Sequence, residues 1–505
     1  MTLEESCWGE GMQRFHLVGC AFLIAVGAVA DAKEIWEGRW IEIRSEHFVL
    51  MSALSEQRSM ALALELEDFR AAVDLLTGAT AVEDPIPTKI YLLPRAEKAL
   101  GFSGSRGGYF SADMRANHAV MIAAGSYNDE VLRHEYTHYL IAIRERRQFP
   151  PWIDEGVAEL LSNLLVTDSV VELGHIVEGR MSNLEDLPWV GFESVLDTRP
   201  PRVGGRLGPM FYAQSWLLVH YLMVGSGRTD FPANVTDYLR RLEGGEPALA
   251  AFEAAFELEV DSLQRRLIIY AGRMGFRQFL LETPFPAAAL RTREMAVDEV
   301  AAEVGLLALL RGNHDDAEEF YEAALAANPD NAKALIGLAN LRKLADRYDE
   351  AVPLYERAVA LEPNDAEHLL DYGGYFLDRA KAEPSADVRR QLLVEARRRF
   401  AQSYRLDPNN PETLSQNGLT YLCEGEDVGK ALESLEEAHA LLPSQEDIQI
   451  ALARAYVAAR DADRARDLLE GLLATSHEES ADEIERLLAE LPVAAESAPV
   501  EAAVE

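Results

Sequence analysis

Two histidines and a glutamate in the segment His134-Glu135-Tyr136-Thr137-His138 have the spacing of a metal site. On a helix, side chains four residues apart project from one face, so both imidazoles can reach a single ion and Glu135 can reach water bound to it. Zinc-dependent hydrolysis requires this geometry, with Glu135 as the general base. Because so short a pattern also arises by chance, the interpretation depends on a third ligand.

Glu155 is the candidate for the third ligand. It lies in residues 152–159, which follow Pro150-Pro151, a pair suited to ending one helix and starting the next. Two neutral imidazoles and one carboxylate leave zinc a fourth position for water, as in catalytic rather than structural sites. Glu159 lies one helical turn further along the same face and can accept a hydrogen bond from the outer nitrogen of a ligand histidine.

A small sheet followed by helices is expected to position these side chains. Strand-like alternation occurs at residues 40–43, 47–50, 89–93 and 118–122, a helical period runs from residue 57 to 76, and the pattern is helical after residue 127. This order predicts an α+β domain.

The two motifs resemble those of the gluzincin metallopeptidases, and among these the peptidase MA-like bacterial proteins, in which HExxH is followed by a Trp-x-x-Glu-Gly-x-Ala-Glu helix. The resemblance covers about residues 38–274 and implies a zincin-like metallopeptidase fold. Sixteen residues separate His138 from Glu155, two fewer than in the aminopeptidase branch, and no Gly-x-Met-Glu-Asn segment precedes the motifs. A metzincin is excluded, because its pattern would need Gly and His where this chain has Ile141 and Arg144.

The resemblance implies a role for each motif residue. Zinc would be held by His134, His138 and Glu155. Glu135 would be the general base, and Glu159 would be the carboxylate that orients a ligand histidine.

Tyr212 begins an apolar helix downstream of the motifs. In gluzincins a tyrosine in this placement often points its hydroxyl at the oxyanion, so Tyr212 is a candidate catalytic residue. The alternative, a core aromatic whose hydroxyl is satisfied within the fold, is equally open. The histidines outside the motifs are interpreted as surface or core residues: His47, His118, His175 and His220.

A repeat occupies residues 295–475. Alanines recur with steps of 34, 45, 35 and 34 at Ala317, Ala351, Ala396, Ala431 and Ala465. Prolines close the units with steps of 34, 45 and 35 at Pro329, Pro363, Pro408 and Pro443. The pattern resembles the tetratricopeptide repeat and implies an all-α solenoid whose concave face holds a peptide or partner protein. The long step predicts an insertion around residues 381–391 that lengthens the helices of the third repeat; a purely structural or dimerising array is the alternative.

Composition narrows the classes of partner. The 85 acidic and 48 basic side chains leave a formal charge of −37, which disfavours nucleic acid and anionic membrane surfaces as partners. Three cysteines, two of them near the N-terminus, exclude a disulfide scaffold and a cysteine-rich zinc module. Any metal must therefore be held by histidine and carboxylate.

The start of the chain has the features of a secretory signal. Residues 17–30 are apolar and too short for a comfortable membrane span, so residues 1–32 are interpreted as a signal peptide, with Met12 suspected as the true start in place of Met1. A retained anchor helix and lipidation at Cys20 are the alternatives. After signal cleavage, the protein is expected in the periplasm or outside the cell, without a stable membrane span.

The domain boundaries follow from composition. Residues 33–282 are assigned to the metallopeptidase-like domain and residues 283–294, which contain two prolines, to a linker. Residues 476–505 are rich in acids and, beyond Leu491, consist mainly of Ala, Val, Pro and Glu. This composition predicts a solvated, disordered acidic tail.

Together these features predict a zinc-dependent peptidase that hydrolyses peptide bonds through metal-activated water, with repeats that bind a protein substrate or partner. An extended substrate is expected to pair with the edge of the strand at residues 118–122. The alternative is a secreted scaffold for protein–protein interaction in which the zincin-like domain is catalytically inactive.

Overall fold

The computed structural model describes residues 35–36, 38–77, 84–94, 100, 102, 108–122, 127–144, 149–167, 170–197, 208–226, 230–272, 278–282, 288–424, 427–473 and 478–492. The predicted signal peptide lies outside these ranges, as do residues 283–287 of the predicted linker and residues 493–505 of the predicted tail. Within the described ranges, no helix is long and apolar enough to cross a bilayer.

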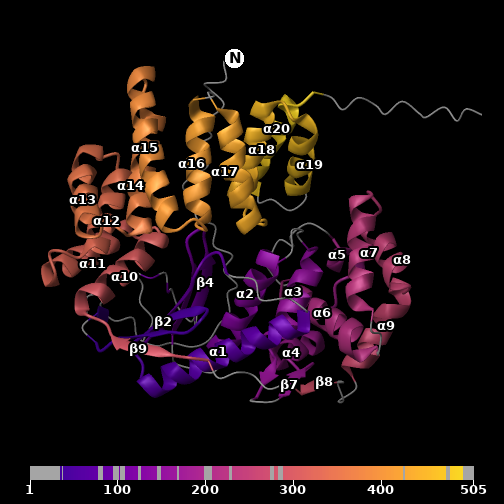
Figure 1. Ribbon diagram of the computed structural model, residues 1–505. Helices are drawn as coiled ribbons and strands as arrows, with labels where there is room; N and C mark the ends of the chain where they lie inside the picture. The colour runs from indigo at the N-terminus through magenta and orange to yellow at the C-terminus, as the bar shows by residue number, and fades with distance from the viewer. Residues whose placement is uncertain are drawn as a thin grey trace, which may run out of the picture.

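A six-stranded sheet organises the N-terminal half (Figure 1). Its strand order is β4-β5-β3-β2-β1-β9, in which β2, β3 and β5 run parallel and the other pairs are antiparallel. The strands span Ile41–Arg44 (β1), Phe48–Ser52 (β2), Thr88–Leu93 (β3), Gly108–Ala112 (β4), Asn117–Ile122 (β5) and Arg291–Glu294 (β9). The four strands predicted from alternation are confirmed, whereas β4 and β9 lack a buried–exposed alternation that would mark them in the sequence.

The first face of this sheet is covered by two long helices. Side chains such as Leu50, Ile90 and Met121 form one core with α1 (Glu56–Thr77) and α2 (Tyr127–Arg144). The helix predicted from the period at residues 57–76 is therefore confirmed, and its apolar side seals the sheet.

The opposite face packs on the repeats. Met51, Tyr91 and Val120 join a second core with α10 (Val297–Leu310) and α11 (His314–Ala327). Because successive side chains in a strand point to opposite faces, each of these residues faces the repeats while its neighbour faces α1 and α2. The first repeats are thus the second covering layer of the sheet, and Figure 1 shows α10 and α11 next to β2 and β9.

Strand β9 occupies part of the linker predicted over residues 283–294. It pairs with β1, and the Met295 amide then donates to the Trp40 carbonyl at 2.9 Å. All four β9 side chains are exposed, so no apolar pattern marks the strand in the sequence. From residue 291 the chain therefore passes from the sheet into α10 without a free spacer.

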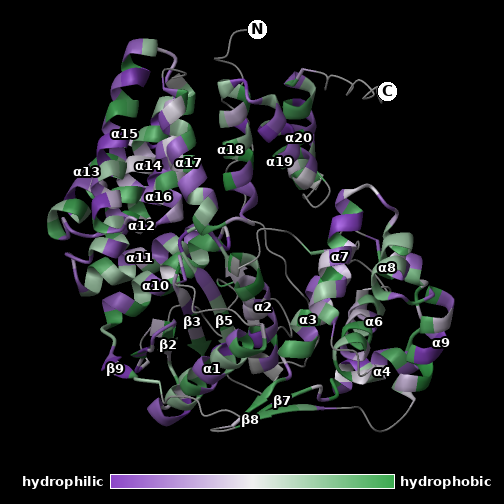
Figure 2. Cartoon of the chain, turned by 45° about the vertical axis from the view of Figure 1, so that its right-hand side comes forward, coloured by the Kyte–Doolittle hydropathy of each residue, from purple (hydrophilic) through white to green (hydrophobic). Residues whose placement is uncertain are grey.

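The rest of the N-terminal half is mostly helical and surrounds Trp152 and Trp216, both fully buried. A small antiparallel sheet, β6-β7-β8, lies at its edge, where β7 and β8 are hydrophobic in Figure 2. These elements are α3 (Pro151–Leu161), β6 (Leu165–Val166), β7 (Val170–Leu173), α4 (Glu178–Asp186), α5 (Phe192–Val195), α6 (Gly208–His220), η3 (Tyr221–Gly225), α7 (Phe231–Glu243), α8 (Ala248–Phe256), α9 (Val260–Ala271) and β8 (Phe279–Glu282). The predicted α+β fold is confirmed for this half.

Paired helices make up the C-terminal half. The first helix of each pair also contacts the first helix of the next pair, so α10, α12, α14, α16 and α18 form the inner face of the solenoid. Helices α14 and α15, of 17 and 21 residues, are the lengthened pair predicted from the irregular step. The helices not yet bounded are α12 (Ala332–Leu344), α13 (Tyr348–Leu361), α14 (Ala366–Ala382), α15 (Ala386–Leu406), α16 (Pro411–Glu424), α17 (Val428–Leu441), α18 (Glu446–Ala459) and α19 (Ala462–Leu473).

Helix α20 (Glu478–Glu490) lies in the segment predicted as a disordered tail, so that prediction is wrong for these residues. Ile484 and Leu487 are 0% and 5% exposed in the core of the last repeats. Because its apolar residues recur at helical spacing, α20 covers the end of the array and leaves acids such as Asp482 and Glu485 in solvent.

Glu303 of α10 is the centre of a polar contact between sheet and repeats. It accepts a hydrogen bond from the Tyr91 hydroxyl of β3 at 3.0 Å and pairs with Lys333 of α12. Burial would raise the pKa of this carboxyl, but Lys333 and Lys89 more than offset burial and lower the pKa to about 2. Glu367 and His118 are further titratable side chains that interact with this group.

Acid should weaken this contact. A carboxyl with a lowered pKa stabilises the fold above its unfolded pKa of 4.5, and the stabilisation is lost as the pH falls toward 2. We expect the wild type to exceed Glu303→Gln in free energy of unfolding by up to about 3 kcal/mol near neutral pH, and the difference to shrink below about pH 4.5. Urea unfolding of both proteins across this pH range measures the difference. A difference that stays constant with pH would contradict the assignment.

Candidate metal centre

Helices α2 and α3 bring the three predicted zinc ligands together. The Nε2 atoms of His134 and His138 are 3.2 Å apart, and Glu155 Oε2 lies 3.2 Å from the first and 3.4 Å from the second. One donor atom from each residue falls within 4.8 Å of the others. Helix α3 begins at Pro151, and its first turns place Glu155 against the histidines of α2.

These distances fit a tetrahedral zinc ion. Bonds of about 2.0–2.1 Å from zinc to its ligands hold neighbouring ligand atoms about 3.3 Å apart in a tetrahedron. Glu155 Oε2 is buried and makes no well-formed hydrogen bond with the described part of the chain, although both imidazoles face it. Two imidazoles with one carboxylate are the donor set of an open zinc site.

Carboxylates face the outer nitrogens of both histidines. Glu159 Oε1 lies 3.5 Å from His134 Nδ1, in the position predicted for it. Asp154 Oδ1 lies 3.1 Å from His138 Nδ1, a role that sequence reasoning missed. The sequence signal for Asp154 was its place directly before Glu155 in the first turn of α3, from which its side chain reaches His138 of α2.

Arg180 of α4 holds Glu159 in place. It donates two hydrogen bonds to the carboxylate, one of them 2.8 Å long between Nε and Oε2. Both side chains are buried, and the two-pronged geometry compensates for the loss of water. No spacing in the sequence points to Arg180, because α4 reaches Glu159 only through tertiary packing.

Tyr212 packs against this pair. It is 7% exposed on α6, and the guanidinium carbon of Arg180 lies 5.2 Å from the centre of its ring. The ring thus supports the side chain that holds Glu159, and a catalytic role for the hydroxyl stays a prediction.

The ionisable side chains of the cluster shift one another's pKa values. Burial would raise the pKa of Glu155, but His138 and His134 hold it well below its usual range. Burial would lower the pKa of His138, but Asp154 and Glu155 raise it well above its ordinary value. Glu135 differs, because burial raises the pKa of its carboxyl and the two histidines only partly offset that effect. A carboxyl whose pKa is raised is suited to receiving and returning a proton.

The four histidines interpreted above as surface or core residues have partners outside this cluster. His47 lies 2.6 Å from Glu67, His175 lies 2.9 Å from Glu172, His118 stacks on Tyr91, and His220 faces the Gly174 carbonyl at 3.0 Å.

The strand at residues 118–122 does not offer a free edge to a substrate, contrary to the prediction. It forms part of β5, whose two edges pair with β3 and β4. A turn at residues 113–116 folds β4 back along β5, so β4 is the terminal strand on this side in the described part of the sheet. Gly108–Ala112 also contacts α2, the helix that carries His134 and His138.

Comparison with known proteins assigns the repeat region. A family model described as Tetratricopeptide repeat matches residues 308–371 and 422–491. These segments are tetratricopeptide repeats. The match lies wholly within the C-terminal half, and the comparisons identify no gluzincin domain around α2 and α3. No curated protein matches the chain.

Several solved structures are similar to part of this chain. A thermophilic tetratricopeptide-repeat protein of Thermus thermophilus is 22% identical, with 38% of this chain and 98% of that chain covered and a TM-score of 0.34. The pilF protein of Pseudomonas aeruginosa is 20% identical over 38% of this chain and 87% of that chain, with a TM-score of 0.32. Yeast Tom70 is 16% identical over 56% of this chain and 50% of that chain, with a TM-score of 0.32.

Gly156, beside the ligand Glu155, lets α3 pack closely on α6. A Cβ atom at this position would lie 2.5 Å from Val219 Cγ2 and 2.6 Å from the Ser215 carbonyl oxygen. The glycine of the motif is therefore a packing requirement. Gly179 on α4 has no neighbouring atom within 4 Å of the same position, which makes it a matched control.

We expect Gly156→Ala to lower the free energy of unfolding by about 1–3 kcal/mol, because the α6 backbone must move aside. Gly179→Ala should be neutral or stabilise by up to about 1 kcal/mol, since alanine favours a helix more than glycine does. Urea unfolding of both variants measures the two effects. Equal effects would show that α3 and α6 are not packed as closely as described.

Proposed function

We propose that this chain is a zinc-dependent peptidase whose repeat array binds a protein substrate or partner. The observation that carries the proposal is the convergence of His134, His138 and Glu155 at the spacing of tetrahedral ligands, with Glu155 Oε2 buried and facing both imidazoles. The carboxylates of Glu159 and Asp154, which face the outer nitrogens of the two histidines, also support the proposal, because ligand histidines in zinc enzymes are held in this way.

The side chains divide the chemistry among them. When bound, zinc would act as a Lewis acid toward a peptide carbonyl and acidify water. Glu135 would accept a proton from the attacking water and return it to the leaving amine. Asp154 and Glu159 would keep the outer nitrogens protonated, so that the Nε2 lone pairs stay directed at the metal position. Arg180 would hold Glu159 for this task.

The substrate would lie along β4. In the described part of the sheet the outer edge of this terminal strand pairs with no other strand, and the strand contacts the HExxH helix. An extended peptide added to such an edge is held mainly by its backbone, a mode that tolerates many side chains. A secreted location, periplasmic or extracellular, would accompany this function if residues 1–32 act as a signal peptide.

The second candidate function is an interaction scaffold with an inactive zincin-like domain. The comparisons favour it, because the family match is confined to tetratricopeptide repeats, which commonly bind proteins. The two functions differ in what they require of Glu135, since a scaffold would bind its partner whether or not this carboxylate is present.

Zinc content and proteolysis of the full chain separate the two functions. We expect about one zinc ion per chain in the wild type and in Glu135→Gln, and none in His138→Ala, by elemental analysis after reconstitution. Cleavage of denatured casein should fall by about 10²–10⁴-fold in Glu135→Gln, because the general base is lost while the metal is kept.

Glu135→Gln is the matched control for the metal, since it keeps all three ligands. Cleavage that survives in this variant would refute the assignment of Glu135. A folded wild type that takes up no zinc would refute the peptidase and leave the scaffold.

A further inference from the structure

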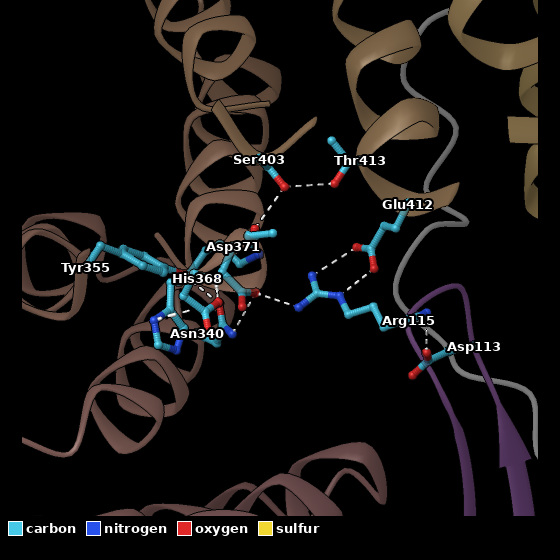
Figure 3. Close-up of polar contacts among 12 residues, drawn as sticks. Asp113, Arg115, Asn340, Tyr355, His368, Asp371, Ser403, Glu412 and Thr413 are labelled. Atoms are coloured by element: carbon cyan, nitrogen blue, oxygen red, sulfur yellow. Dashed lines mark hydrogen bonds and ion pairs between the residues drawn. The ribbon is translucent and has the colours of Figure 1, made fainter. Parts of the chain in front are cut away.

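The turn between β4 and β5 has a rigid backbone that presents one arginine. Asp113 Oδ1 accepts hydrogen bonds from the amides of Arg115 at 2.7 Å and of Ala116 at 2.8 Å. The Asp113 amide donates in turn to the Ala116 carbonyl at 3.1 Å. With both sides of the turn fixed, the Arg115 side chain extends away from the sheet toward the repeats (Figure 3).

Two carboxylates of the inner face receive this arginine. Glu412, in the first turn of α16, accepts from Arg115 Nε and, at 2.9 Å, from a terminal guanidinium nitrogen. Asp371 of α14 accepts from the other terminal nitrogen at 3.0 Å. Figure 3 shows the guanidinium between the two helices. We call Asp371 and Glu412 the guanidinium clamp.

The array itself holds the clamp residues in position. Asp371 Oδ1 also accepts a hydrogen bond from Asn340 Nδ2 at 3.0 Å. The side-chain oxygen of Asn340, Oδ1, in turn accepts from the Tyr355 hydroxyl at 2.5 Å. Next to Glu412, the Thr413 hydroxyl lies 3.0 Å from that of Ser403. Asp371 is thus held by a contact within the array that does not include Arg115, and the Ser403–Thr413 contact ties the start of α16, where Glu412 lies, to α15, so this part of the site is preorganised.

The clamp requires a planar cation. The side chains of Asp371 and Glu412 are 8% and 15% exposed, and two carboxylates so withdrawn from water are costly without a positive partner. A guanidinium meets one carboxylate with two parallel bonds and still has a donor for the second. An ammonium group has no such fork, so lysine is a poor substitute.

We propose that the inner face of the repeats between α14 and α16 is a guanidinium-binding site and that Arg115 of the same chain is its resident ligand. The face on which such repeats usually bind peptides is here occupied by the chain's own hairpin. An outside protein would reach this part of the face only by supplying an arginine that displaces Arg115. Since Arg115 lies in the turn that ends β4, the site also anchors the terminal strand of the sheet, independently of any metal.

Chemical rescue of the full chain tests the site. In Arg115→Ala the clamp keeps its carboxylates but loses its cation, so about 20 mM methylguanidinium chloride should refill it and raise the melting temperature by roughly 1–3 °C. The wild type should not respond, because its site is filled, and Arg115→Ala/Glu412→Gln should not respond, because the fork is lost. Methylammonium chloride at the same concentration controls for salt. If Arg115→Ala gains no more from methylguanidinium than from methylammonium, the proposal is overturned.

A double-mutant cycle covers the case in which Arg115→Ala does not fold. It compares urea unfolding of the wild type, Arg115→Lys, Glu412→Gln and the double variant. If the two changes acted independently, their effects on the unfolding equilibrium constant would multiply. We expect the effect of the double variant to be about tenfold smaller than this product, since either change alone breaks the fork. Independent effects would overturn the proposal.

Discussion

The two buried faces of the six-stranded sheet are the constraint on which the rest of the structure depends. In β3, Ile90 and Tyr91 are both almost fully buried, yet they belong to different cores. A strand that is apolar on both sides needs a layer on each side. Helices α1 and α2 supply one layer and the first tetratricopeptide repeats supply the other, so the two halves of the chain fold around one sheet. The polar contacts of Glu303 and Arg115 then set the register of the second layer against the sheet.

The geometry of the candidate metal centre depends on this arrangement. Helix α2 lies on the sheet, and α3 is pressed on α6 at Gly156, which leaves Glu155 little freedom relative to the histidines. The repeats also reach α2 directly, since Leu442 belongs to the same core as Ile143 near the end of that helix. The HExxH helix is therefore held by the sheet, by its neighbouring helices and by the array, a level of support that precise ligand geometry demands.

The sequence predicted those parts of the structure that depend on local periodicity. Spacing along a helix was enough to place His134 and His138 on one face, and the repeat period was enough to locate the helix pairs. The parts that depend on packing between distant segments had no local signal. Strand β9 carries only exposed side chains, Arg180 meets Glu159 through tertiary packing, and Arg115 finds its carboxylates 256 and 297 residues further along the chain. Helix α20 is an intermediate case, because the acids that suggested disorder outnumber the few leucines and isoleucines that anchor it.

The shared sheet also limits how the functions of the two halves can be separated. Removing the repeats would expose Met51, Tyr91 and Val120 on one face of the sheet. The remaining half would therefore lose part of its own core. Loss of activity in such a truncation would report on folding and could not distinguish delivery of a substrate from support of the metal centre. Point changes that leave both cores intact avoid this difficulty. In the proposed function Glu135 acts in the chemistry, and Arg115 lies in the contact between the hairpin and the inner face, so a change at either residue addresses one half of the molecule while the sheet stays covered.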